Sequence, residues 1–335
     1  AELVAAHDVH DVGLVERGQA LGGARPVGPR AARQGVGEPA EEAVIGLVLD
    51  QGLGPDDVAR AGVREGADVG RGPATTAFIE AFPDRYIDTG IAETNSVSIA
   101  AGLAAAGYRP FVFGIGAFLA PKCLEQIRTD IAVNRLPVTM ISAWGGLDMG
   151  FFGASHHGIE DISILRGTPH LTIASAADDV SMRALMRTAV TEGLPFYIRA
   201  PSAGAADVYD TAPRVARGEL SMVSQGVDVA LVGTGLGTSL CVQAAAVLQE
   251  SGVSATVVDA VYLKPFDGEA ICRLARTVRA VVVVEEHNVR AGLTSLVAEA
   301  LGRGGVAVPL EGVGLPDGDL AVAVPQRLLA RYGLT

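Results

Sequence analysis

Apolar runs of strand length alternate with longer helical stretches between about residues 67 and 205. The runs that suit strands are 110–115, 137–142, 171–174 and 195–198. The stretches that suit helices are 91–106, 119–134, 159–166 and 178–192. Strands that alternate with helices imply βαβ units and a mainly parallel sheet, so this part of the chain is predicted to form an α/β domain.

The same alternation returns from about residue 226 to residue 335. The expected strands are 229–232, 255–259 and 280–285, and the expected helices are 239–251, 268–277 and 293–301. Residues 206–225 lack the pattern and are interpreted as a linker. The chain is therefore predicted to contain two consecutive α/β domains, at 67–205 and 226–335, with mainly parallel sheets.

Residues 1–66 do not show this alternation. They contain no aromatic residue and no lysine, and residues 21–40 are rich in Gly, Pro, Ala and Arg, as loops and linkers are. Residues 42–50 suit either a strand or a short helix. We assign this segment to the first domain without predicting its structure.

Composition narrows the class of protein. The 335 residues are 49% hydrophobic with a formal net charge of −12, which allows a large core and argues against nucleic-acid binding. The apolar runs are too short for a membrane span, and the first residues lack the segments of a secretory signal. Three scattered cysteines, Cys123, Cys241 and Cys272, indicate a reduced cytoplasmic protein in which each is a core residue.

Glu93 lies near the start of the expected helix 91–106. An acidic residue in the first turn stabilises a helix by roughly 0.3–1 kcal/mol through the helix dipole, which is one explanation for it. The rest of this helix consists mainly of Ala, Gly, Ile, Leu and Ser, so it suits burial against other backbone. Glu93 is then expected to be buried too, and a buried carboxylate needs a partner or a proton.

The string D-x-G-I-A-E at 88–93, followed by AAGLA-x-x-GYRPFV at 100–112, resembles the pyrimidine-binding domain of transketolases and related thiamine diphosphate enzymes. The resemblance implies that Glu93 is catalytic and hydrogen-bonds the aminopyrimidine of the cofactor. Thiamine works through a carbanion on its thiazolium ring, and a carboxyl group at the far pyrimidine nitrogen favours the imino tautomer that removes the proton. It also implies that Phe118 packs on the pyrimidine, with a core role as the alternative, and that Ile115 replaces a second aromatic residue there.

Residues 144–161, WGGLDMGFFGASHHGIED, follow the C-terminal end of an expected strand. Ligands bind at this end of the strands in open α/β sheets. The string S-H-H-G-I-E-D-I at 155–162 resembles the transketolase segment that carries a substrate-contacting histidine. That resemblance implies a catalytic, substrate-binding role for His156 and assigns none to His157. A histidine in such a loop is otherwise more often structural.

This loop departs from the family pattern. Phe151 and Phe152 stand where relatives usually carry an acidic pair, and Trp144 stands where a histidine is common. Because those family residues bind sugar hydroxyls, we place Trp144 and Phe152 at the substrate and predict a substrate that is less hydroxylated or otherwise modified. Arg199 matches the phosphate-binding position of transketolases, and a surface ion pair is the alternative.

The turn Gly233–Leu240 has the pattern GxGxG between an expected strand and helix, with Asp259 downstream, which is weak evidence for a nucleotide site. The same string resembles the opening of the transketolase C-terminal domain. The strings K-P-F-D at 264–267 and E-E-H at 285–287 share that resemblance. It implies a domain for packing and assembly.

The resemblance covers residues 67–335 and corresponds to the second half of a transketolase. The chain lacks the G-D-G string with a downstream Asn that holds the diphosphate and its metal in the family. The resemblance therefore implies one subunit of a split enzyme. Thiamine diphosphate and Mg²⁺ would be anchored mainly by an N-terminal, diphosphate-binding partner, in a dimer of heterodimers.

The predicted function is transfer of a two-carbon ketol or acyl unit to or from a small-molecule substrate that the sequence does not identify. Within the same class, the chain could be the β subunit of a 2-oxo acid dehydrogenase or part of a deoxyxylulose-phosphate-synthase-like enzyme. In another class, it could be a non-catalytic α/β protein that binds a nucleotide or acts as a scaffold.

Overall fold

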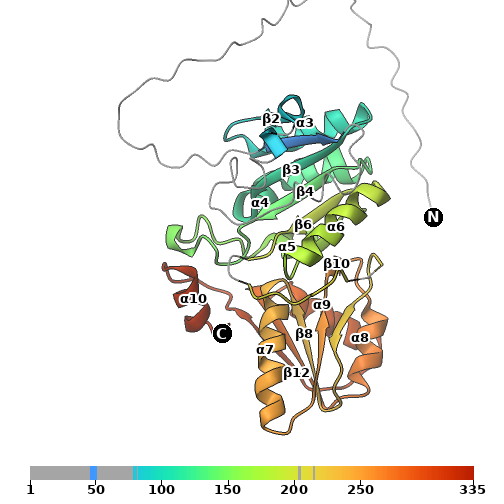
Figure 1. Cartoon of the computed structure of the whole chain (residues 1–335), viewed down its shortest axis with the longest axis vertical. Helices are drawn as coiled ribbons and strands as arrows, with labels where there is room; N and C mark the ends of the chain where they lie inside the picture. Colours follow the sequence, from blue (N-terminus) through green and yellow to red (C-terminus); the bar gives the residue numbers. More distant parts are fainter. Residues whose placement is uncertain (1–45, 51–77, 81, 203–204, 214–215) are drawn as a thin grey trace, which may run out of the picture. The chain divides into compact units, whose positions relative to one another are not determined.

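The structure is a computed structural model that describes residues 46–50, 78–80, 82–202, 205–213 and 216–335 (Figure 1). The predictions made for the rest of the first 77 residues lie outside this part of the chain. All described residues belong to one compact unit, Glu41–Thr335.

The first domain is built on a seven-stranded sheet with the order β10-β5-β6-β4-β3-β1-β2. Strands β3, β4, β6 and β5 are parallel to one another. At one side of them β1 pairs antiparallel with β3 and with β2, and at the other side β10 pairs antiparallel with β5. The strands are β1 (Gly46–Asp50), β2 (Tyr86–Asp88), β3 (Arg109–Ile115), β4 (Thr139–Ala143), β5 (Thr172–Ser175), β6 (Phe196–Arg199) and β10 (Tyr262–Lys264).

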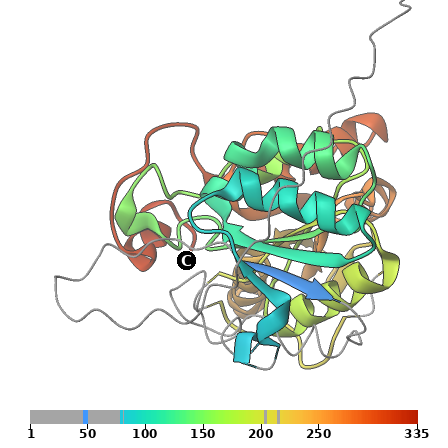
Figure 2. The same ribbon diagram turned by 90° about the horizontal axis from the view of Figure 1, so that it is seen from above.

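Helices cover both faces of this sheet (Figure 2). Along β3, Val112 faces the core that includes α3 (Glu93–Ala105) and α4 (Gly116–Gln126), while Phe111 and Phe113 face the core that includes α6 (Asp179–Glu192). This alternation is the period of two expected of a strand buried on both faces. The remaining helical turns of the domain are η1 (Pro83–Arg85), η2 (Ile127–Ala132), η3 (Gly150–Phe152) and α5 (Asp161–Leu165).

The second domain contains a five-stranded sheet with the order β12-β11-β8-β9-β7, parallel except for β7. Along β8, Leu231 packs with residues of α7, while Ala230 and Val232 belong to the core that includes α8 and α9. The elements are β7 (Ser221–Ser224), β8 (Val229–Thr234), α7 (Leu236–Glu250), β9 (Ala255–Asp259), α8 (Gly268–Ala275), β11 (Ala280–Asn288), α9 (Leu293–Arg303), β12 (Leu310–Leu315) and α10 (Pro325–Arg331).

The predicted fold class is confirmed: the chain forms two α/β domains with mostly parallel sheets. Several elements were not predicted. The expected linker 206–225 contains β7, and the two short elements β10 and β12 were also missed. Strands of three to six residues at sheet edges carry too few alternating positions to be distinguished from loops.

The three cysteines are free and buried, as predicted. Burial raises the pKa of the Cys123 and Cys241 thiols to about 12, so neither is a thiolate nucleophile at neutral pH. Within the part of the chain that the structure describes, no helix is both long and apolar enough to cross a bilayer.

Candidate active site

Glu93 is the first residue of α3, and its side chain is only 3% exposed. Its Oε2 lies 2.5 Å from Nζ of Lys122 on α4, whose side chain is 50% exposed. The N-cap of α3 is Ala92, which makes no side-chain cap hydrogen bond. The buried carboxylate is therefore satisfied by a lysine that reaches in from the surface, in addition to its favourable place at the helix start.

A continuous series of contacts leads from Glu93 to His156. The Lys122 Nζ lies 5.4 Å from the centre of the Phe118 ring, which stands edge-on to the His156 ring with 5.0 Å between centroids. The His156 ring in turn lies 4.7 Å from that of Phe152. The structure thus brings together four of the residues that the sequence predicted for the site.

His156 belongs to residues 144–158, which we call the site loop. This loop follows β4 and is closed by a bridge between Gly146 and Gly158. Nδ1 of His156 lies 2.9 Å from the Ser155 hydroxyl, which leaves Nε2 for another partner. Partial burial and the neighbouring His157 lower the pKa of His156, so its imidazole is neutral at pH 7.

Three predicted residues stand outside this series of contacts. Ile115 is buried at the end of β3, and Trp144 is half-buried directly after β4 with a φ of 49°. Arg199, at the end of β6, is buried: its Nε lies 3.0 Å from Asp161 Oδ2, and its Nη2 donates to the backbone carbonyl oxygens of Gly158 and Glu286. The ion pair is therefore internal rather than at the surface, and the substrate role of Arg199 stays a prediction.

Arg199 belongs to a buried polar cluster that sequence reasoning missed. Asp161 Oδ2 also accepts a hydrogen bond of 2.8 Å from the Tyr197 hydroxyl, and His287 Nε2 lies 3.8 Å from Asp161 Oδ1. Burial opposes the charge on Arg199, but Asp161 and Glu286 outweigh it and raise its pKa. The sequence signals for this cluster were the family position of Arg199 and the family strings around residues 155–162 and 285–287.

The family strings of the second domain have structural explanations. Glu285 accepts hydrogen bonds from the backbone N–H groups of Leu293 and Thr294, at 2.6 and 2.8 Å, and so caps α9. Lys264 donates from Nζ to backbone oxygens after α5, and Asp267 caps α8 by accepting from Ala270 N at 2.8 Å. Glu285 and Asp267 thus stabilise the starts of helices, and Lys264 holds the backbone that follows α5, so all three have structural roles.

The Gly-rich turn after β8 is not accompanied by an acidic side chain that is available to bind the ribose of a nucleotide. A Cβ on Gly237 would lie 2.1 Å from the Val284 carbonyl oxygen, so the glycine permits close packing of α7 on β11. The Asp259 carboxylate accepts hydrogen bonds from Thr238 Oγ1 at 2.9 Å and Tyr209 OH at 2.8 Å. Because Asp259 is buried with internal partners, it is not presented to a ribose.

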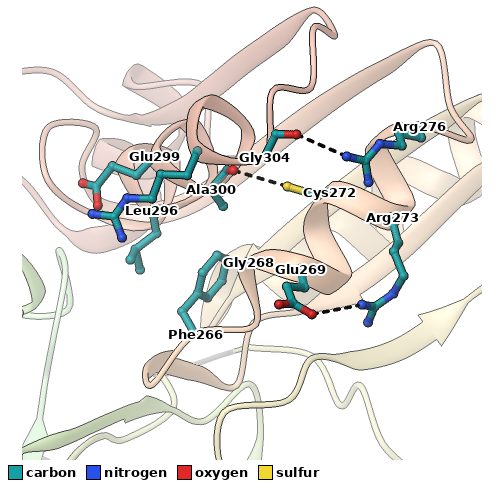
Figure 3. A pocket seen from close by; sticks show the side chains of 11 residues that line it. Phe266, Gly268, Glu269, Cys272, Arg273, Arg276, Leu296, Glu299, Ala300 and Gly304 are labelled. Carbon is teal, nitrogen blue, oxygen red and sulfur yellow. Dashed lines mark hydrogen bonds and ion pairs between the residues drawn. The ribbon is translucent and has the colours of Figure 1, made fainter.

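A cavity of about 610 Å³ lies between α8 and α9 (Figure 3), and none of the residues predicted for the active site lines it. Its arginines are largely matched by partners: Arg273 faces Glu269 at 3.8 Å, and Arg276 donates to the Gly304 carbonyl oxygen. Among the described residues, no group of three or more His, Cys, Asp or Glu is arranged to hold a metal ion.

Residues 59–204 match the family described as transketolase, pyrimidine binding domain, and residues 218–335 match transketolase, C-terminal domain. One of the subunits of the apulose-4-phosphate transketolase of Phocaeicola vulgatus is 33% identical over 266 residues, which cover 79% of this chain and 85% of that protein. The 1-deoxy-D-xylulose-5-phosphate synthase of Symbiobacterium thermophilum is 36% identical over 266 residues, and this chain spans only 41% of its length. A solved split gene transketolase, described as an inactive beta4 tetramer, has a TM-score of 0.72 and 36% identity, with 81% of this chain and 86% of that chain covered.

Proposed function

Because the chain belongs to the transketolase family, we propose that it is the pyrimidine-binding subunit of a split enzyme that transfers a two-carbon ketol or acyl unit. The observation that carries this proposal is the buried Glu93 carboxylate, which Lys122 links to the Phe118 ring; that ring in turn contacts His156. A carboxyl group and an aromatic face fit an aminopyrimidine, because the protonated carboxyl can donate to a ring nitrogen and the flat ring can pack on the aromatic face.

Thiamine diphosphate, when bound, would supply a nucleophilic carbon that protein side chains lack. Glu93 would hydrogen-bond the pyrimidine nitrogen, and Phe118 would pack on the ring. For this, Lys122 must leave the carboxylate, and its 50% exposed side chain is free to turn toward solvent. His156 Nε2 would face the substrate, with Nδ1 held by Ser155.

We assign the diphosphate and Mg²⁺ to an N-terminal partner subunit. In support, the chain matches one component of a multi-subunit transketolase over 85% of that component, but a single-chain synthase over only 41%. Magnesium is usually held by carboxylates together with substrate phosphates, which a diphosphate-binding partner would supply. We expect a dimer of heterodimers in the cytoplasm, where the three free cysteines would stay reduced.

The test is reconstitution with the product of a neighbouring reading frame that carries G-D-G and a downstream Asn. The two chains should copurify, and ketol transfer should require both chains together with thiamine diphosphate and Mg²⁺. If the pair forms but shows no thiamine-dependent activity with any ketose phosphate or 2-oxo acid donor, the enzymatic proposal fails.

A second candidate is a deoxyxylulose-phosphate-synthase-like activity, which the 36% identity to such a synthase favours. The β subunit of a 2-oxo acid dehydrogenase is the related alternative. Both types of enzyme would use a 2-oxo acid donor. Release of CO₂ from pyruvate by the reconstituted pair, without ketose turnover, would select this alternative over transketolase-type transfer.

We predict a substrate with fewer free hydroxyl groups than xylulose 5-phosphate. Phe151 and Phe152 are about half exposed, and Phe152 contacts His156, so an apolar surface adjoins the proposed substrate group. An apolar surface cannot replace the hydrogen bonds that hydroxyls lose on leaving water. Xylulose 5-phosphate should be a poor donor, and Phe152→Asp should raise its kcat/KM relative to a deoxy analogue. Rapid, selective use of xylulose 5-phosphate by the unaltered pair would contradict this prediction.

Activity should depend on neutral His156. Because the pKa of His156 is lowered from its ordinary value of 6.5, the imidazole becomes protonated only at a pH below that value. The kcat/KM of the reconstituted pair should therefore be constant near neutrality and fall on acidification only below about pH 6.5. A pH–rate profile measures this, and His156→Asn should remove the acidic limb from the residual rate. An acidic limb with a midpoint above pH 7 would exclude His156 as its source.

A further inference from the structure

The site loop is held largely by the second domain. Its residue Leu147 is fully buried in a core cluster with Leu231 of β8, Leu315 of β12 and Leu328 of α10. Just after the loop, the Ile159 carbonyl oxygen accepts a hydrogen bond of 3.0 Å from Asn288 N, at the end of β11. The segment that carries His156 is therefore in contact with elements of the second domain near both of its ends.

Glu286 on β11 makes the most specific of these contacts. Its Oε1 accepts a hydrogen bond of 2.9 Å from Leu147 N, and its Oε2 accepts one of 2.6 Å from the Ser202 hydroxyl. The residue is only 3% exposed. It also lies close to Gly146, where an added Cβ would be 2.2 Å from Glu286 Cδ and where φ is +62°. A glycine is needed here because it allows both the left-handed backbone and the close approach of the carboxylate.

The turn of the site loop that carries the two phenylalanines also rests on the end of the chain. A Cβ on Gly150 would lie 2.2 Å from Leu328 Cδ1, so helix α10 packs directly against this turn. Val322, which precedes α10, is 3.0 Å from the corresponding position on Gly153. The loop is therefore supported at Leu147 by a buried carboxylate and at the turn by the last helix.

We propose that Glu286 is a positioning residue for the site loop, and that the second domain thereby holds His156 and Phe152 in place for the substrate. The inference rests on the proposed function for its catalytic part only. Glu286 does not touch the reacting groups; it acts through the Leu147 N–H and the bridge between Gly146 and Gly158. A displacement of about 1 Å at a reacting group can lower a rate about 10²-fold, so a second-domain carboxylate can control catalysis without contacting the substrate.

The first test uses hydrogen exchange on the isolated chain. Glu286→Ala should speed amide exchange across residues 146–158. It should also increase the quenching, by a solute added to the solvent, of the fluorescence of Trp144, the single tryptophan, which begins the loop. Glu286→Gln should restore native behaviour, since its amide oxygen can accept from Leu147 N while its NH₂ donates to the Ser202 hydroxyl. Glu311→Ala, at an exposed position on the neighbouring strand β12, is the matched control and should change nothing.

Gly146→Ala approaches the same contact from the loop side and should reproduce the faster exchange of residues 146–158. It decides the question if Glu286→Ala does not fold. Because neither measurement needs cofactor or partner, the result is independent of whether the proposed function holds. Unchanged loop exchange and Trp144 quenching in the folded Glu286→Ala chain would overturn the inference, as would equal changes in Glu311→Ala. If Glu286→Ala does not fold, unchanged loop exchange in Gly146→Ala would overturn it.

The second test uses the reconstituted pair. Glu286→Ala should lower kcat/KM by about 10- to 100-fold with cofactor affinity unchanged, and Glu286→Gln should recover most of the activity. A purely structural role would lower the amount of folded enzyme without changing kcat/KM per folded site. Native kcat/KM in folded Glu286→Ala would remove the positioning role.

Discussion

Glu93→Gln is expected to lower kcat of the reconstituted enzyme by about 10²- to 10⁴-fold, the range that a positioned acid–base group contributes. Glutamine keeps the size of the side chain but cannot exchange a proton with the pyrimidine nitrogen. The carboxylate is buried, so water does not readily substitute for it. Steady-state kinetics at saturating thiamine diphosphate measure the loss, and a calorimetric titration of the cofactor shows whether binding is also weakened.

The pairing with Lys122 requires a control, because Glu93→Gln also removes an ion pair of 2.5 Å. If Glu93 served only to neutralise Lys122, the double variant Glu93→Gln with Lys122→Met would recover activity. We expect the double variant to recover thermal stability while remaining inactive. Recovery of both properties would reduce Glu93 to a structural residue and remove the central observation behind the proposed function.

Much of the fold could be predicted from the sequence because its long strands are buried on both faces. Strand β3, for example, was expected at 110–115 and extends over Arg109–Ile115. The helix expected at 119–134 is instead α4 followed by the π-helical turn η2, since one continuous apolar pattern does not distinguish between the two helix types. Strand β10 could not be predicted to join the first sheet, because pairing with β5 depends on contacts between residues far apart in the chain.

The candidate site divides in the same way. Glu93, Phe118 and His156 were predicted because each matches a position of the family pattern, and the structure joins them through Lys122 and by a ring contact. Arg199 also matches such a position, but position alone could not reveal that Asp161 lies beside it in the interior. The role of Glu286 could not be predicted either, since its partner Leu147 is a backbone N–H group 139 residues away.

On the proposed function, the substrate specificity of the chain would depend on how the site loop is supported. The first domain contains Glu93 and Phe118, whereas the second domain, including α10, holds the loop that carries His156. Changes in β11 or α10 could thus alter substrate choice without altering any residue that touches the substrate. Arg199 connects the site loop to both domains, because its guanidinium contacts Asp161 of the first domain, Gly158 of the loop and Glu286 of the second domain.

Arg199→Met is accordingly expected to destabilise the chain by about 3–5 kcal/mol, the usual cost of removing one partner from a buried ion pair. Methionine fills most of the volume but leaves the carboxylates of Asp161 and Glu286 buried without their cation. The free energy of unfolding in urea measures this loss, and amide exchange of the site loop should rise because the bond to the Gly158 carbonyl oxygen is lost.

Arg290→Met is the matched control, since Arg290 pairs with Asp317 at 2.9 Å while both side chains remain largely exposed. A surface pair of this kind contributes about 0–1 kcal/mol to stability. The free energy of unfolding of the control should therefore be close to that of the native chain. Equal losses in the two variants would show that burial adds nothing to the Arg199 pair. A large loss for Arg199→Met alone, accompanied by faster exchange in the site loop, would establish that the same guanidinium supports both the stability of the chain and the geometry of the site.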